Sequence, residues 1–66
     1  MPIIRVEMFK GRSPELKKKI ARELIDGFMR VAGGGKPEAF TVVFTEVDKS
    51  DWAVGYEMMT EKYPDK

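Results

Sequence analysis

Two apolar runs separated by one amphipathic segment constrain the fold of this chain most strongly. Residues 3–9 (IIRVEMF) and 39–47 (AFTVVFTEV) are rich in β-branched and aromatic types, which predicts two strands. Between them, apolar residues recur at helical spacings of four and three: Leu16, Ile20, Leu24, Phe28 and Val31. A strand, a helix and a strand in this order predict a β-α-β unit with parallel strands and a right-handed crossover.

The ends of the central helix carry their own signals. Ser13 is a suitable N-cap, and Pro14 fits the first helical position, where its missing N–H costs no hydrogen bond. The glycine run 33–35 predicts the C-cap at Gly33 and a flexible connector. This run and Lys36 do not meet the GxxxxGK[ST] spacing of a phosphate-binding loop.

The region after the second strand is shorter and more polar. Residues 52–59 (WAVGYEMM) predict a short hairpin or edge segment, and residues 60–66 (TEKYPDK) are expected to be loose. We therefore expect residues 1–66 to form a single domain of the α/β (α+β) class, a β-α-β subunit with a short C-terminal hairpin.

The size of the chain predicts that it works with partner subunits. A chain of 66 residues buries only about 60% of the surface of its unfolded form. The absence of cysteine and histidine excludes disulfides and zinc sites with thiolate or imidazole ligands, and no acidic calcium-type loop is visible, so we expect no metal site. Self-association remains as the expected source of stability.

Charge and hydropathy exclude several classes of partner. The net charge is +1, and the only basic run, residues 17–19, is interpreted as a solvated helix face. We therefore expect no nucleic-acid partner. No segment is apolar for long enough to span a bilayer or resembles a signal peptide, so a cytoplasmic protein without a membrane partner is expected.

Common catalytic groups are scarce, which draws attention to the start of the chain. Without cysteine and histidine, Cys–His and Ser–His–Asp sites are absent, and among the carboxylates only Glu7 and Glu46 lie in predicted strands. Methionine ahead of a small residue is normally removed, which would leave Pro2 with a free secondary amine. Apolar surroundings or a nearby cation would lower the pKa of such an amine from its usual value of about 7.7–8.0, toward that of a general base.

The order of these motifs resembles the 4-oxalocrotonate tautomerase family. The resemblance covers nearly the whole chain: PIIRVEMFKGRS at the start, a helix, a second strand with Thr45-Glu46, and DWAVGYE at residues 51–57. It implies a β-α-β subunit that dimerises into a four-stranded sheet with two helices. It also implies a homo-oligomer, commonly a homohexamer built as a trimer of dimers, with a dimer as the smaller possibility.

The resemblance also implies a function and site residues. The activity would be that of a cofactor-independent isomerase, a keto–enol tautomerase that acts on a small unsaturated 2-oxo acid or a related enol. Pro2 would be the catalytic base, and Arg12 would bind the substrate carboxylate across the same pocket. Trp52 would form an apolar wall near the proline.

One position departs from the family pattern. The well-studied tautomerases carry a second arginine on the second strand, donated across a subunit boundary, where this chain has Thr41. Thr41 is therefore a substrate-binding candidate that offers a neutral hydrogen bond in place of a cation. Arg5, Arg30 or Lys36 of a neighbouring subunit could replace the missing charge.

Two alternatives stay open at this point. The first is a proline-dependent hydratase or dehalogenase on the same scaffold, in which an ammonium Pro2 acts as the acid and Glu46 or Asp51 activates water. The second is a non-catalytic subunit of a mixed oligomer, whose partner brings the missing arginine.

Overall fold

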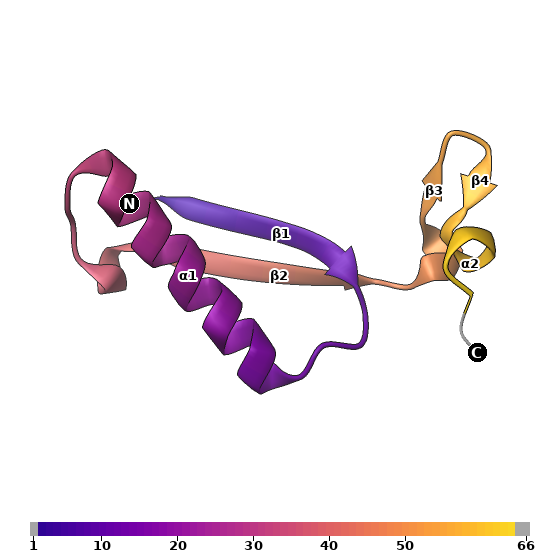
Figure 1. Cartoon of the computed structure of the whole chain (residues 1–66), viewed down its shortest axis with the longest axis horizontal. Helices are drawn as coiled ribbons and strands as arrows, with labels where there is room; N and C mark the ends of the chain where they lie inside the picture. Colours follow the sequence, from indigo (N-terminus) through magenta and orange to yellow (C-terminus); the bar gives the residue numbers. More distant parts are fainter. Residues whose placement is uncertain (1, 65–66) are drawn as a thin grey trace.

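The structure, a computed structural model, describes residues 2–64 and has the predicted β-α-β arrangement (Figure 1). Strand β1 (Ile3–Phe9) and strand β2 (Thr41–Val47) pair in parallel, with Ile3 beside Thr41 and Phe9 beside Val47. Helix α1 (Pro14–Ala32) makes the crossover between them. The predicted fold class is therefore confirmed.

Both ends of α1 form where the sequence predicted them. The Ser13 hydroxyl accepts a hydrogen bond from the backbone N–H of Leu16 at 3.2 Å, and Pro14 occupies the first turn. At the other end Gly33 adopts a left-handed conformation with φ 91°, and its N–H donates to the carbonyl of Met29 at 2.9 Å. Only glycine adopts this conformation without a steric cost, so the helix stops here.

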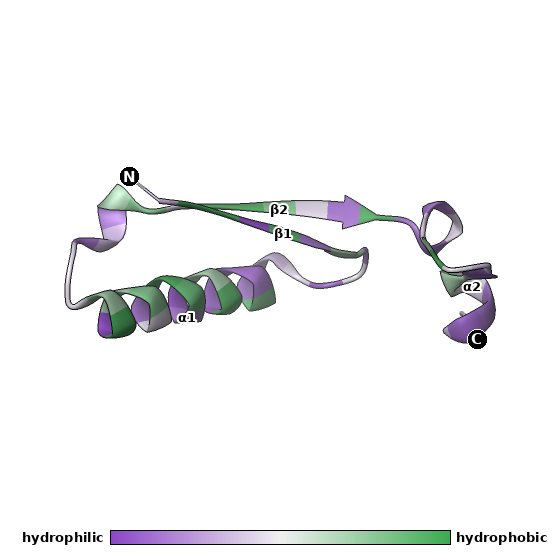
Figure 2. Ribbon diagram, turned by 90° about the horizontal axis from the view of Figure 1, so that it is seen from above, coloured by the Kyte–Doolittle hydropathy of each residue, from purple (hydrophilic) through white to green (hydrophobic). Residues whose placement is uncertain are grey.

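Helix α1 covers one face of the two-stranded sheet, as Figure 2 shows from above, and no described element covers the other face. An ion pair of 2.9 Å between Lys17 of α1 and Glu46 of β2 joins the helix to this covered face. The predicted apolar stripe of α1 is only partly used. Ile20 and Leu24 are half-buried, whereas three members remain exposed: Leu16, Phe28 and Val31.

The second strand begins two residues later than predicted. Pro37–Ala39 form a short 3-10 turn, η1, in which the N–H of Phe40 donates to the carbonyl of Pro37 at 3.1 Å. The expected start of the strand at residue 39 is therefore wrong. Pro37 explains the difference, because its fixed φ suits the first position of such a turn.

The chain then runs past the end of the sheet into a small C-terminal unit. The 3-10 turn η2 (Lys49–Asp51) leads into an antiparallel hairpin of β3 (Ala53–Val54) and β4 (Glu57–Met58), which confirms the predicted hairpin. Figure 1 shows this unit beyond the arrowhead of β2, at the opposite end of the sheet from the N-terminus.

The tail is more ordered than its polarity predicted. Residues Met59–Lys62 form a helical turn, α2, so the expectation of a loose segment is wrong for Thr60–Lys62, and residues 65–66 of that expectation lie outside the described part. The Glu61 carboxylate accepts a hydrogen bond from the N–H of Met58 at 3.3 Å, and Met59 is 3% exposed. A buried anchor and a cap therefore hold the turn in place.

A single subunit has very little interior. Within residues 2–64, Met59 is the only residue classed as buried. The chain exposes 5394 Å², whereas a compact monomer of this mass exposes about 4300 Å². The radius of gyration is 15.0 Å, against about 11 Å for a compact domain of this length. The subunit is thus elongated, with much apolar surface left uncovered.

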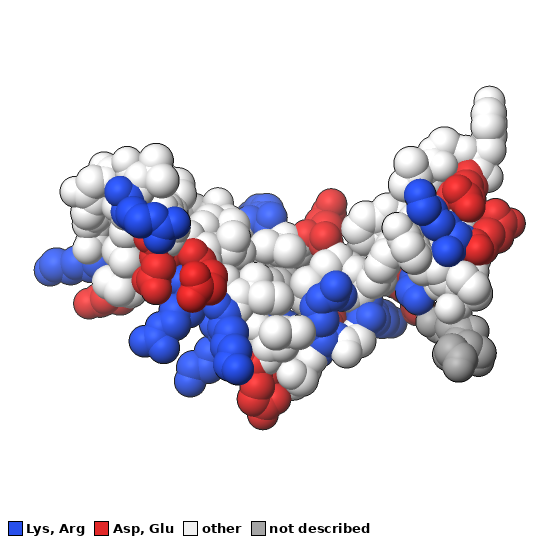
Figure 3. Space-filling model, viewed as in Figure 1, with Lys and Arg blue, Asp and Glu red and all other residues white. Residues whose placement is uncertain are grey.

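Charged side chains of both signs alternate over the face seen in Figure 3, with uncharged surface between them. In the described part of the chain, no helix is both long and apolar enough to cross a membrane.

Candidate active site

The first candidate residue, Pro2, lies directly before β1 at one end of the sheet. Its ring is half-buried, and its carbonyl accepts a hydrogen bond from the N–H of Thr41 at 3.0 Å. The nitrogen of a proline has no hydrogen to give to the sheet, so cleavage of the peptide bond before Pro2 would remove no hydrogen bond of the strand pair. We call this region, with Pro2 and Thr41, the proline end.

Thr41 is exposed at the proline end, beside Ile3 in the neighbouring strand. The register places Arg5 beside Val43, and both lie on the same open face as Ile3 and Thr41. Arg30 lies in the last turn of α1, and Lys36 lies just before η1. Both segments lie near this end of the sheet in Figures 1 and 2. Among the three alternative cations, Arg5 is the one that lies in a strand of the sheet, two residues along β1 from the partner of Thr41.

Arg12 lies in the turn that joins β1 to α1, at the opposite end of β1 from Pro2. Gly11 has φ 123°, which a side chain would oppose, and this lets the chain turn sharply before Arg12. Nη1 of Arg12 donates a long hydrogen bond of 3.4 Å to the carbonyl of Phe9. No other interaction of this guanidinium is found within residues 2–64, so most of its five N–H donors can reach a ligand.

Three aromatic rings gather at the same end. The rings of Phe9 and Trp52 meet edge to face with centroids 4.6 Å apart, and the ring of Tyr63 lies 6.1 Å from that of Phe9. The N–H of Met59 donates to the carbonyl of Trp52 at 2.8 Å, which ties this cluster to the buried anchor. We call this region, with Phe9, Arg12, Trp52 and Tyr63, the arginine end.

A groove of about 400 Å³ opens at the arginine end. It combines two aromatic side chains with three cationic ones: Phe9, Tyr63, Lys10, Arg12 and Lys49. Such a lining suits a small anion with an apolar part, because a guanidinium can bind a carboxylate through two parallel hydrogen bonds.

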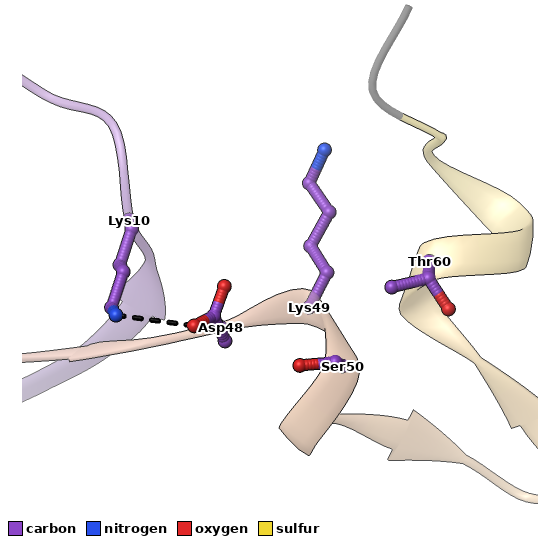
Figure 4. Close-up of a pocket in the computed structure, with 5 residues that line it drawn as sticks. All are labelled: Lys10, Asp48, Lys49, Ser50 and Thr60. Carbon is purple, nitrogen blue, oxygen red and sulfur yellow. Dashed lines mark hydrogen bonds and ion pairs between the residues drawn. The ribbon is translucent and has the colours of Figure 1, made fainter.

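The two lysines of the groove are engaged elsewhere in different ways. Lys10 pairs with Asp48 at 3.1 Å, and both side chains are more than half exposed. Figure 4 shows Lys49 extending away from Asp48, beside an adjoining pocket of about 340 Å³. The ammonium of Lys49 donates to the carbonyl of Tyr63 at 2.8 Å. Arg12 is therefore the cation of the groove that is best placed to hold a carboxylate.

A single subunit does not bring Pro2 and Arg12 together. Strand β1 separates them, and its seven residues span about 20 Å. Trp52 lies with Arg12 at the arginine end, while Thr41 lies with Pro2 at the proline end. The expected pocket with Pro2, Arg12 and Trp52 is therefore not formed within one subunit, and the candidate residues divide between the two ends of the sheet.

The candidate carboxylates also separate. Glu46 lies on the covered face and is paired with Lys17, so it is not directed toward either end of the open surface. Asp51 and Glu7 line a cavity of about 270 Å³ beside Trp52. Groups of three or more potential metal-ligating side chains do not occur among residues 2–64.

Four residues of the groove were not identified as site candidates from the sequence: Phe9, Lys10, Lys49 and Tyr63. Tyr63 was assigned to a loose tail. The aromatic side chain of Tyr63, four residues after the last apolar residue Met59, was a signal that one helical turn could bring both to one face.

Comparisons with known proteins agree with this architecture. The family described as tautomerase enzyme matches residues 2–62. A probable tautomerase from Ralstonia nicotianae, RSp1151, is 38% identical over 53 residues, which cover 80% of each chain.

Solved structures of similar chains carry the same fold. TomN, a 4-oxalocrotonate tautomerase homologue in the tomaymycin biosynthetic pathway, is 28% identical with a TM-score of 0.85 and 97% coverage of both chains. A heterohexamer 4-oxalocrotonate tautomerase from Chloroflexus aurantiacus J-10-fl is 30% identical with a TM-score of 0.81, covering 92% of this chain and 97% of that one. The β-α-β subunit with its C-terminal hairpin therefore belongs to the tautomerase family.

Proposed function

We propose that this chain is a cofactor-independent keto–enol tautomerase acting on a small unsaturated 2-oxo acid or a related enol. The observation that carries this proposal is the position of Pro2. It is half-buried at the end of a paired strand, where removal of Met1 would expose a ring amine without loss of a sheet hydrogen bond. Membership of the tautomerase family supports an isomerase.

The proposed reaction moves one proton within the substrate. The free amine of Pro2 takes the proton from the enol hydroxyl, the carbon–carbon double bond shifts, and a carbonyl forms. The proline ammonium then returns the proton to carbon, so the amine is regenerated and no co-reactant is consumed. Thr41 would offer its hydroxyl to the substrate near Pro2.

A second copy of the chain would complete the site. Antiparallel pairing of β1 with β1 of another subunit about a two-fold axis near Val6 would set Pro2 opposite Lys10 of that subunit. The proline end of one copy would then face the arginine end of the other, and a four-stranded sheet with two helices would result. The exposed apolar surface and the large radius of gyration support such a homo-oligomer, as a dimer or as a hexamer of three dimers.

In this arrangement Arg12 binds the substrate carboxylate and draws electron density toward it. Its donors face a groove that Phe9 and Tyr63 line with apolar surface. Trp52 backs the groove through its contact with Phe9 and would keep water away from the reacting amine.

The test compares Pro2→Ala and Arg12→Ala in turnover of simple enols, such as a 2-hydroxydienoate and the enol of phenylpyruvate. Intact-mass measurement must first show that Met1 is absent. Pro2→Ala should lower kcat by at least about 100-fold, because a positioned base contributes about 10²- to 10⁴-fold. Arg12→Ala should chiefly raise KM, by about 10- to 100-fold, because a charge-assisted hydrogen-bond pair is lost.

The dependence of rate on pH supplies a second readout for the same proposal. A free amine as the base requires kcat/KM to rise with pH and level off above the pKa of that amine. Full activity of both variants, or a rate that falls as the amine loses its proton, would contradict a tautomerase.

A proline-dependent hydratase or dehalogenase is the second candidate function. It is favoured by Asp51, which lines the cavity beside Trp52 together with Glu7 and could activate water there. Glu46 is less suited to that role because Lys17 holds it on the covered face. In this reaction the protonated amine is required, so activity would fall with rising pH and depend on Asp51.

A non-catalytic subunit of a mixed oligomer is the remaining possibility. It is supported by the similarity to the Chloroflexus aurantiacus heterohexamer and by Thr41 in place of an arginine. Purified chain that retains Met1, or that turns over enols only with a second kind of subunit, would favour it.

A further inference from the structure

Tyr63 occupies a position that the family comparison does not reach. The family match ends at residue 62, and Tyr63 follows immediately, after α2. Its side chain nevertheless lines the groove that contains Arg12. The residue is 50% exposed, and its ring is tilted by 59° against the ring of Phe9. Part of the ring therefore packs within the subunit, while part is accessible from the groove.

Two hydrogen bonds fix the backbone of this residue. The N–H of Tyr63 donates to the carbonyl of Met59 at 2.9 Å, and its carbonyl accepts from the ammonium of Lys49 at 2.8 Å. Met59 is the buried residue of the C-terminal unit, so the first bond connects Tyr63 to that buried anchor. A ring held in this way loses little conformational freedom when a ligand binds against it.

The groove has two kinds of lining, which would bind two different parts of a ligand. Arg12 supplies N–H donors for a carboxylate, and Phe9 and Tyr63 supply two ring surfaces beside it. An aromatic or flat conjugated group gains stacking or edge contacts against such rings beyond its simple burial, whereas a short alkyl chain does not.

We propose that Tyr63 determines substrate specificity by selecting carboxylates that carry an aromatic or flat conjugated group. Lys49 is a positioning residue for this role, because its hydrogen bond holds the Tyr63 backbone. The inference rests on the proposed function for the nature of the substrate acid, since Arg12 is there its carboxylate ligand. For the proposed tautomerase, the preferred substrate is then an aryl-substituted or fully conjugated 2-oxo acid enol.

The test measures binding without turnover. The full-length protein is titrated with 3-phenylpropanoate and with butanoate, and the fluorescence of Trp52, the only tryptophan of the chain, reports binding near Phe9. Tyr63→Leu keeps an apolar side chain but removes the ring. It should weaken phenylpropanoate about 3- to 10-fold and leave butanoate unchanged, while Tyr63→Phe should retain both affinities.

Lys49 is tested through the ratio of the two affinities, because loss of its charge affects both carboxylates alike. Lys49→Met should lower the ratio, whereas Lys49→Gln, whose amide can still donate to the carbonyl of Tyr63, should retain it. Circular dichroism and sedimentation of each variant check that the fold and the assembly are intact.

The proposal is overturned if Tyr63→Leu leaves the ratio of affinities unchanged, or if wild-type protein does not prefer phenylpropanoate to butanoate. The same titrations in a Pro2→Ala background separate this inference from the proposed function. A preserved preference there, together with undiminished turnover by Pro2→Ala, would remove the proline mechanism and leave the role of Tyr63 standing.

Discussion

The two ends of the sheet differ in how firmly their residues are held. At the arginine end, Phe9 packs edge to face on Trp52, and the unit is anchored by Met59, which is 3% exposed. At the proline end, Pro2 has one backbone hydrogen bond to Thr41 and a half-buried ring. One end is thus a formed groove, and the other presents Pro2, the proposed base, with little surrounding it.

The two ends are suited to different tasks in the proposed site, one to substrate binding and the other to proton transfer. A groove with a cation and aromatic walls can orient a carboxylate but has no base, whereas a ring amine at the end of a strand can move a proton but cannot hold the substrate. The separation of about 20 Å along β1 prevents one subunit from using both. The proposed oligomer would join the two complementary ends.

The largest expected effect is complementation between two inactive variants. Pro2→Ala lacks the base, and Arg12→Ala lacks the carboxylate ligand, so each homo-oligomer should be nearly inactive at substrate concentrations far below the KM of Arg12→Ala. Unfolding them together and refolding the mixture should restore roughly a quarter of wild-type activity, because random pairing gives that share of sites both native residues. Turnover of the enol substrate before and after mixing is the measurement.

A matched control replaces one partner of that mixture. Pro2→Ala refolded with the double variant Pro2→Ala/Arg12→Ala contains no native proline and should remain inactive. Absence of recovery in the first mixture, with normal assembly by sedimentation, would show that the two ends do not meet between copies.

The β-α-β body could be predicted from the sequence because its signals are local and repeated. Side chains of β1 alternate between exposed and half-buried over most of the strand. Ser13 marks the start of the helix through its capping hydroxyl, and Gly33 marks its end through a left-handed backbone. The exposed members of the helical stripe, such as Val31 at 85% exposure, show where the periodicity misleads. Apolar periodicity records every surface that a helix can bury, including those buried only by a partner.

The residues of the candidate site could be predicted from the sequence, but their positions relative to one another could be predicted less well. Pro2 and Arg12 stood out by residue type and by resemblance to a family. The strand predicted between them already implies that they lie far apart in one chain. The short helix α2 and Tyr63 depend on burial of Met59 and on the bond from Lys49, which are long-range contacts without a periodic signal.

Substitution of Met59, the buried residue of the C-terminal unit, should disturb the arginine end and leave the β-α-β unit folded. Met59→Ala removes the buried side chain of the C-terminal unit, and large-to-small changes of this kind cost about 2–5 kcal/mol. Trp52 and Tyr63 should then become mobile, which predicts a red shift of Trp52 emission and an increase in KM of about tenfold. The helical signal of α1 in circular dichroism should remain.

Met59→Leu is the control for that change, because a volume-conserving substitution usually costs less than about 1.5 kcal/mol. Collapse of the whole fold in Met59→Ala would mean that the two regions are not energetically separable.

The smallest effect is expected on the covered face, where Lys17 and Glu46 pair at 2.9 Å. Their side chains are 26% and 30% exposed, so water still solvates both partly. Lys17→Met should lower the free energy of unfolding by about 0.5–1 kcal/mol, as for other partly exposed pairs. The kcat/KM should not change, because the sheet separates this pair from its open face and neither residue lines the groove.

A double-mutant cycle with Glu46→Gln isolates the pair from other effects of each substitution. Glu46 lies beside Met8, close along the strand to the arginine end, so proximity along the chain would predict an effect on substrate binding. Orientation predicts none, because Glu46 points to the covered face and Phe9 to the other. A fall in kcat/KM of more than about tenfold in Lys17→Met would therefore assign a catalytic part to Glu46. It would also support the hydratase or dehalogenase alternative in which Glu46 activates water, which the position of Glu46 on the covered face argues against.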